Sequence, residues 1–121
     1  MKATRKHISI LSRLSRQAAF DSLRKTKLRW VSKGFALQAI ESDSLSFCVI
    51  TSKQAAKLAT DRNKMRRRLR VIAYEILPTL AKQNTTYMIV ARKESLTLPI
   101  DDLRKDLKWC LKKLNLGNDA L

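Results

Sequence analysis

One segment limits the folds open to this chain more than any other: residues 60–82 have the pattern of a long amphipathic helix. Thr60 and Asp61 are typical of a helix start. Apolar residues then recur at intervals of four, three, four and four, the spacing of one buried helical stripe. The stripe consists of Met65, Leu69, Ile72, Ile76 and Leu80. Pro78 predicts that the helix kinks or ends near Leu77. We expect the stripe to pack on a sheet.

Three apolar segments predict the strands of that sheet. Residues 34–40 alternate well enough for a strand, in which Phe35 and the other odd-numbered residues share one face. Residues 45–51 are rich in β-branched and apolar residues and predict a central strand, and residues 87–91 predict another buried strand. Because residues 41–44 are turn-like, we expect the first two strands to pair as a hairpin.

Two further helices complete the expected order of helix, strands, helix, strand and helix. The first covers about residues 15–25. The last begins after Pro99, where Asp101 and Asp102 favour a helix N-terminus, and Gly117 is a plausible stop. Its apolar face consists of Ile100, Leu103, Leu107, Cys110, Leu111 and Leu114. The sequence therefore predicts a small, single-domain α+β sandwich with helices packed on a mostly antiparallel sheet.

Positive charge is concentrated in one part of the chain. The formal net charge is +16, and residues 1–70 hold 18 Lys and Arg against 4 Asp and Glu. Such a surplus repels itself and favours a polyanionic partner, so we expect the binding surface within these residues. Residues 1–11 are expected to form a mobile basic arm, residues 12–116 the folded domain, and residues 117–121 a C-terminal tail.

Several classes of protein are excluded. No run approaches the roughly 18 apolar residues of a membrane span. Two cysteines, Cys48 and Cys110, make neither a disulfide framework nor a zinc site, and we expect both to be buried in a protein of the reducing cytoplasm. The only histidine, His7, falls in the expected arm. Since the sequence offers no nucleophile together with a base to activate it, a partner must supply the catalytic groups for any hydrolysis.

Residues 62–70 carry the strongest functional signal, because six of these nine residues are cationic. With Met65 and Leu69 buried, helical geometry places four polar residues on the opposite half of the helix and three more beside them. The four are Asn63, Arg66, Arg67 and Arg70, and the flanking three are Arg62, Lys64 and Arg68. Like charges one turn apart cost roughly 0.2–0.5 kcal/mol per pair, which favours a bound anion. Arginine binds phosphate in bidentate fashion, although a solvated charged face or a localisation signal is an alternative.

The order of these features resembles the protein subunit family of bacterial ribonuclease P. That family has an R-N-R-x-K-R-x-x-R helix after a strand that ends in S-K-K. Here the helix motif lies at residues 62–70 and is preceded by Thr51-Ser52-Lys53-Gln54. Residues 20–23, 29–39 and 88–92, together with the closing helix, are also similar, and the resemblance covers about residues 12–114.

Five positions depart from the family pattern. Lys64 stands in place of the second arginine, Arg66 in place of the usual lysine, and Gln54 in place of the second lysine of S-K-K. Cys48 occupies a position that is usually glycine, and Val71 follows the motif where an acidic residue is often found. These departures leave the details of contact open.

The resemblance implies a fold, an activity and partners. The fold would be an αβββαβα arrangement with a left-handed crossover around the basic helix. The activity would be that of a ribonucleoprotein, whose large RNA subunit performs magnesium-dependent removal of the 5′ leader from precursor tRNA. The protein would bind the catalytic RNA and the leader, with no membrane or DNA partner. Magnesium would be bound mainly by the RNA, with Asn63 near a hydrated ion.

The resemblance also divides the site residues into two groups. The catalytic RNA would contact Arg62, Asn63, Lys64, Arg66, Arg67, Arg68 and Arg70. The leader would lie in a cleft between the first helix and the sheet, on Phe20, Phe35, Arg29, Lys33 and Lys53. The two phenylalanines would stack on bases, with core packing as the alternative for each. Phe47 and Trp109 are expected in the core, and the place of Trp30 stays open.

Three other classes compete with this interpretation. A ribosomal-type structural RNA-binding protein shares the charge and is the main alternative. A DNA-binding helix-turn-helix protein needs two helices joined by a short turn, whereas here a strand precedes the basic helix. A membrane-surface helix needs bulky aromatic residues opposite the cations, but the stripe of residues 65–80 is aliphatic.

Overall fold

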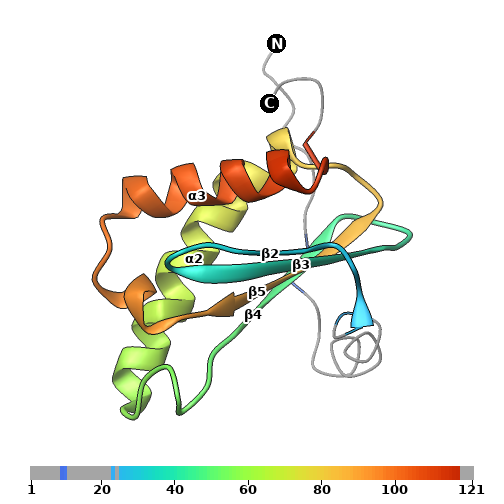
Figure 1. Ribbon diagram of the computed structural model, residues 1–121. Helices are drawn as coiled ribbons and strands as arrows, with labels where there is room; N and C mark the ends of the chain where they lie inside the picture. Colours follow the sequence, from blue (N-terminus) through green and yellow to red (C-terminus); the bar gives the residue numbers. More distant parts are fainter. Residues whose placement is uncertain (1–8, 11–22, 24, 118–121) are drawn as a thin grey trace.

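The computed structural model describes residues 9–10, 23 and 25–117, which form a sheet with two α-helices packed on one face (Figure 1). The α+β class and the order of strands, helix, strand and helix are as expected. The strands are β1 (Ser9–Ile10), β2 (Arg29–Val31), β3 (Phe35–Glu41), β4 (Ser46–Ile50) and β5 (Thr85–Ala91). The helices are α2 (Ala59–Leu80), the 3-10 helix η1 (Lys93–Leu96) and α3 (Ile100–Lys113).

The sheet is mixed, and its strand order is β1-β4-β5-β3-β2. The pairs β2–β3 and β3–β5 are antiparallel, whereas β1–β4 and β4–β5 are parallel. The expected hairpin of β3 with β4 is therefore wrong, because β5 lies between these two strands. The loop after β3 carries the chain past the position that β5 later fills, and α2 is the crossover that joins β4 to β5. A turn-like sequence predicts a change of direction but does not determine which strand lies alongside.

The two faces of the sheet have different partners. The face toward α2 and α3 carries alternate residues of the strands, among them Phe35, Phe47 and Tyr87, which are fully buried in the main core. The opposite, outer face carries Cys48 and Met88, which pack against Leu23. This alternation follows from the pleat of a strand, in which neighbouring side chains point to opposite faces.

The helix boundaries differ from expectation at both C-terminal ends. Pro78 is buried inside α2, which continues to Leu80 and so ends three residues beyond Leu77. Helix α3 ends without using Gly117. Asn115 adopts a left-handed conformation with φ 59°, and its N–H donates to the carbonyl oxygen of Lys112 at 3.1 Å. The N–H of Leu116 also donates back into the last turn, which completes a Schellman cap.

The apolar stripe and the cysteines lie as predicted. Four residues of the stripe are buried, and the fifth, Leu80, is half-buried against the core. Cys48 and Cys110 are both buried in the interior. No helix among the described residues is long and apolar enough to cross a membrane.

Some expectations concern residues outside the described part of the chain. Of the helix expected at 15–25, only Leu23 and Lys25 are described, and both are helical. Phe20 and His7 lie outside the described residues. Ser9 and Ile10, which were assigned to a basic arm, pair with β4, and the other residues of that segment are outside the description.

Candidate nucleic-acid interface

Residues 63–74, all within α2, line a hollow of about 430 Å³. We name it the basic hollow. Its lining residues are Asn63, Arg66, Arg67, Arg70, Val71 and Tyr74. The first four are the residues that helical geometry placed opposite the buried stripe, so the structure brings this predicted set together. Val71 was noted only as a departure from the family pattern, and Tyr74 was not singled out from the sequence.

Arg66 and Asn63 are held in a fixed arrangement within the basic hollow. One terminal nitrogen of Arg66, Nη1, donates to Oγ1 of Thr51 at 2.6 Å, and Nη2 donates to Oδ1 of Asn63. Because Thr51 directly follows β4, these bonds tie the helix to the end of the sheet. The Asn63 amide is thereby oriented with its oxygen toward Arg66. Both side chains are set in place without a ligand, which lowers the entropic cost of binding one.

Arg62 and Arg68 donate to backbone carbonyl groups within the protein. Nη1 of Arg62 donates to the carbonyl oxygens of Ala56 and Lys57 at 2.9 and 2.8 Å, in the loop before α2. Nε of Arg68 donates to the carbonyl oxygen of Ser95 at 3.0 Å, and its Nη2 donates to that of Leu98.

Arg68 therefore holds η1 and the start of α3 against α2. It was expected among the contacts to the catalytic RNA, but two of its donors are used inside the protein. Lys64 and Arg67 are exposed, as a phosphate contact requires.

The charges of this surface are not neutralised within the described residues. Both ion pairs found there belong to Arg104, which joins α3 to Glu75 of α2 at 2.7 Å and also contacts Asp101. The hydrogen bond from Arg104 lowers the pKa of Glu75. No carboxylate of the described residues pairs with a cation of residues 62–70, so the positive field of the basic hollow is directed to solvent.

The structure separates the four described residues among the five expected at the leader. Arg29 is exposed on β2 and is opposite Gln38, which in turn is opposite Met88. Arg29 therefore shares the outer face of the sheet with Met88. Lys53 is exposed in the loop between β4 and α2. Phe20 lies outside the described residues.

Phe35 does not lie at the outer face, and its expected role in stacking on a base is wrong. Its side chain is 0% exposed and packs in the core beneath the helices. Leu37 and Ala39, which alternate with Phe35 along β3, also lie in this core, so the alternation noted in the sequence already opposed an exposed ring.

Lys33 also lies elsewhere. It lines a hollow beside α3 with Leu98, Asp102, Lys105 and Asp106. Burial and the charge of Asp102 raise the pKa of Asp106, and the charge of Lys33 opposes that shift. Lys33 is therefore near an acidic part of α3, away from the outer face of the sheet, and the leader contact expected of it is not supported.

Two aromatic side chains are exposed in a way that the sequence analysis did not predict. Trp109 was expected in the core but is 47% exposed. Its ring meets Trp30 edge to face at 5.7 Å between centroids, and Nζ of Lys113 lies 5.1 Å from its centroid. Tyr74 is 45% exposed, and its ring meets Phe47 edge to face at 5.2 Å. Phe47 itself is buried as expected. Tyr74 follows Arg70 by four residues, and residues four apart lie on the same side of a helix. The sequence could therefore have indicated that Tyr74 lies beside Arg70.

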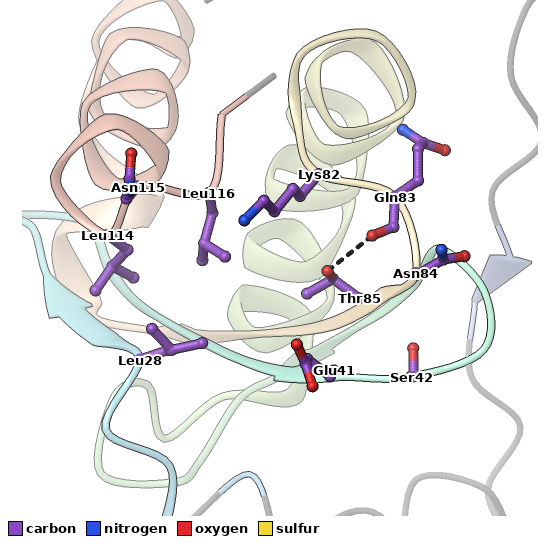
Figure 2. Close-up of a pocket in the computed structure, with 10 residues that line it drawn as sticks. All are labelled: Leu28, Glu41, Ser42, Lys82, Gln83, Asn84, Thr85, Leu114, Asn115 and Leu116. Carbon is purple, nitrogen blue, oxygen red and sulfur yellow. Dashed lines mark hydrogen bonds between the residues drawn. The ribbon is translucent and has the colours of Figure 1, made fainter. Parts of the chain in front are cut away.

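A third hollow, of about 500 Å³, lies beyond the C-terminal end of α2 (Figure 2). It is bordered by the turn between α2 and β5, the end of β3, and the cap of α3. Its residues are Leu28, Glu41, Ser42, Lys82, Gln83, Asn84, Thr85, Leu114, Asn115 and Leu116. One lysine and one glutamate balance each other here. This hollow therefore lacks the excess of positive charge that distinguishes the basic hollow.

The described residues show no cluster for metal binding, and burial leaves the thiol of Cys110 unactivated. No group of three or more His, Cys, Asp or Glu among residues 9–10, 23 and 25–117 is placed to hold a metal ion. Burial, assisted by the charge of Asp106, raises the pKa of Cys110 to about 12. Its thiol is therefore protonated at neutral pH and is a poor nucleophile.

Comparison with known proteins decides the family. The Ribonuclease P family model matches residues 9–115. The chain belongs to the ribonuclease P protein family. The ribonuclease P protein component of Paramagnetospirillum magneticum is 32% identical over 111 residues, which are 86% of this chain and 83% of that relative.

Solved structures of ribonuclease P proteins have the same fold. The protein from Staphylococcus aureus superposes with a TM-score of 0.71 at 17% identity, covering 90% of this chain and 97% of that one. The protein from Thermotoga maritima superposes with a TM-score of 0.70 at 19% identity, covering 85% and 97%. At these identities the structures show the fold alone.

Membership of this family makes the chain a protein component of ribonuclease P, an RNA–protein endoribonuclease of tRNA processing. The basic hollow of α2 fits an RNA-binding role. The ribosomal-type alternative has no support from these comparisons.

Proposed function

We propose that this ribonuclease P protein binds the catalytic RNA through the basic hollow and assists that RNA in removing the 5′ leader of precursor tRNA in the cytoplasm. The observation that carries the proposal is the grouping of Arg66, Arg67 and Arg70 in one hollow with no paired carboxylate among the described residues. Phosphate groups of RNA supply the missing negative charge. The cationic side chains do not all have the same role in binding the RNA.

Four residues present donors to the RNA, and others hold the surface in shape. Lys64, Arg67 and Arg70 contact phosphate, and Arg66 joins them from its fixed position beside Thr51. Arg62 acts indirectly, because it holds the backbone of the loop that carries Lys53. Arg68 maintains the packing of α3.

Magnesium in this proposal is bound by the RNA. The described residues offer no group of acidic side chains placed to hold a metal ion, and the Oδ1 atom of Asn63 already accepts from Arg66. The free amide donors of Asn63 suit a contact to RNA oxygen or to water in a hydrated ion's shell. Magnesium bound to the RNA would supply the activated water and charge stabilisation of hydrolysis, and the protein would strengthen its binding by neutralising phosphates.

The leader of precursor tRNA crosses the outer face of the sheet. Arg29 and Lys53 are the described cations that fit phosphate contacts along this path. Phe35 and Lys33 do not contribute, because one is buried and the other lies beside α3.

The test is reconstitution with the cognate ribonuclease P RNA and an assay of leader removal at low magnesium. We expect the wild-type protein to stimulate cleavage. We expect the triple variant Arg66→Ala/Arg67→Ala/Arg70→Ala to lose most of that stimulation, because each lost phosphate contact weakens RNA binding. Raising the magnesium concentration should restore cleavage in part.

The matched control removes the same three positive charges from α3, in Lys105→Ala/Lys108→Ala/Lys112→Ala. These lysines are exposed on the helix that does not carry the basic hollow. Their loss should leave most of the stimulation intact. Equal losses in the two triple variants would mean that net charge, and not the basic hollow, accounts for the activity.

A further inference from the structure

The basic hollow has an apolar end that phosphate binding does not explain. Val71 is 42% exposed and Tyr74 is 45% exposed, directly beyond the arginines on the same stretch of α2. Phosphate gains nothing from an aliphatic or aromatic neighbour. An exposed apolar surface beside a cluster of cations fits a ligand that is itself part apolar and part anionic.

The polar end of the basic hollow has unused donors. Nε of Arg70 is buried and has no hydrogen-bond partner among the described residues. Most buried donors in proteins are paired, so an unpaired one beside a hollow indicates a group that binds there. An arginine presents several donors in one plane, and one phosphate can accept from two of them.

The ring of Tyr74 is held ready for stacking. It packs edge to face on Phe47, which is fully buried in the core. This contact restrains the ring while a large part of it stays exposed. A planar base can stack on such a ring whatever its sequence, because every base has a π-face.

We propose that the basic hollow binds one unstacked nucleotide of single-stranded RNA. The base stacks on Tyr74 against Val71, and the attached phosphate is bound by Arg70 and Arg67. The hollow, about 430 Å³, is large enough for a single nucleotide but not for a duplex. This inference deepens the proposed function, since it assigns part of the RNA contact to a base as well as to phosphate.

Photo-cross-linking locates the base. The probe is a ten-nucleotide uridine RNA that carries 5-iodouridine, bound to the full-length protein, irradiated and digested with trypsin. Cleavage after Arg70 and Lys82 gives a peptide of residues 71–82 whose only aromatic residue is Tyr74. We expect a cross-link to this peptide. Cross-links confined to other peptides, such as residues 109–112 with Trp109, would overturn the proposal.

Binding measurements then separate the base from the phosphates. The second probe is an abasic ribose–phosphate chain of the same length, which keeps the charges and lacks the bases. Stacking on Tyr74 predicts that the wild-type protein binds the uridine RNA about 5- to 150-fold more tightly than the abasic chain. Tyr74→Leu, which keeps an apolar contact with Phe47, should bring this ratio close to one. Tyr74→Phe should preserve it.

Trp109→Ala is the matched control, because Trp109 is equally exposed and also packs edge to face on a second aromatic ring. It should keep the preference for the uridine RNA. A ratio unchanged by Tyr74→Leu, or one abolished equally by Trp109→Ala, contradicts the proposal.

The two proposals fail differently. The arginine triple variant should weaken binding of both probes, whereas Tyr74→Leu should weaken only that of the uridine RNA. Suppose that cleavage at low magnesium depends on the arginines, but Tyr74→Leu leaves the ratio of affinities for the uridine RNA and the abasic chain unchanged. The nucleotide site alone is then refuted. If the ratio depends on Tyr74 while the arginine variant stimulates cleavage normally, the proposed function fails and the nucleotide site stands.

Discussion

The cations of residues 62–70 are alike in sequence but differ in what their donors contact. Arg62 and Arg68 donate to backbone carbonyl groups, and Arg66 donates to two side chains. No hydrogen bond to the described residues engages Arg67. Helical periodicity predicted which residues share the exposed side of α2. It could not predict which of them bind the protein itself, because the accepting carbonyl groups of Ser95 and Leu98 lie about 30 positions away in the chain.

Phe35 and Arg29 provide a test of the corrected leader surface. Phe35→Ala should lower the free energy of unfolding by about 3–5 kcal/mol, because it leaves a cavity in the core. Arg29→Ala should change stability by less than about 0.5 kcal/mol, as is usual for an exposed residue. It should nevertheless weaken binding of precursor tRNA relative to mature tRNA. Urea denaturation and filter binding measure the two effects.

The control for this pair is Phe35→Leu, which keeps most of the buried apolar volume. It should bind the leader as the wild-type protein does. A selective loss of leader affinity in this variant, without loss of stability, would return Phe35 to the binding surface.

At the scale of elements, the strands and helices were more predictable than their arrangement. The segments of β3, β4, β5, α2 and α3 were all recognised from apolar patterning. The pairing of β3 with β4 was wrong because patterning shows that a strand is buried, not which neighbour covers its edge. Apolar patterning missed the two short strands β1 and β2, since two or three residues do not make a recognisable period. Only the αβββαβα order implied by the family resemblance provided a third strand before α2.

Apolar patterning also failed to place Trp109, because it does not show which element lies alongside a residue. Trp109 lies on α3, one position before the buried Cys110, and was assigned to the core by its size and apolar character. Its exposure depends on the edge of β2, where Trp30 meets it. A strand that was not predicted could not be used to place it.

The contact of Arg68 with η1 and with Leu98, just before α3, gives a prediction at this scale. Arg68→Met removes both hydrogen bonds while keeping a long side chain. It should lower the free energy of unfolding by roughly 1.5–3 kcal/mol, the usual range for a hydrogen bond that involves a charged group. Urea denaturation monitored by tryptophan fluorescence is suitable, because Trp109 lies on α3.

Arg67→Met is the matched control on the neighbouring position of α2. It should leave stability within about 0.5 kcal/mol of the wild-type value and weaken RNA binding instead. Equal stability losses for the two variants would show that the bonds of Arg68 to Ser95 and Leu98 do not stabilise the fold.

At the scale of the whole molecule, the charge is far from balanced. The net charge of +16 lies mostly in the first 70 residues, and the structure shows no carboxylate partners for the basic face of α2 among the described residues. Composition alone was enough to predict a polyanionic partner. The distribution of that charge over one helix face and the outer sheet required the fold.

Self-repulsion predicts that the free protein becomes more stable as salt is added. Screening shortens the reach of surface charges to about 8 Å at physiological ionic strength. We expect a rise in Tm of several degrees between 20 and 300 mM NaCl, equivalent to a stability gain on the order of 1 kcal/mol. Differential scanning calorimetry measures it.

The Tm of the variant Arg66→Ala/Arg67→Ala/Arg70→Ala should rise less on addition of NaCl than that of the wild-type protein, because three of the repelling charges are gone. A Tm that does not respond to salt in either protein would show that the cations are already compensated within the chain.

The position of β5 has a consequence for synthesis on the ribosome. This strand is the last of the sheet to be translated, yet it lies between β4 and β3 and is hydrogen-bonded to both (Figure 1). While residues 85–91 are still inside the ribosome, β3 and β4 each have one unpaired edge. The apolar stripe of α2 then lacks part of the sheet on which it packs. The domain therefore cannot be completed piece by piece from the N-terminus, and its basic face must leave the ribosome, itself rich in RNA, before a finished fold exists to present it.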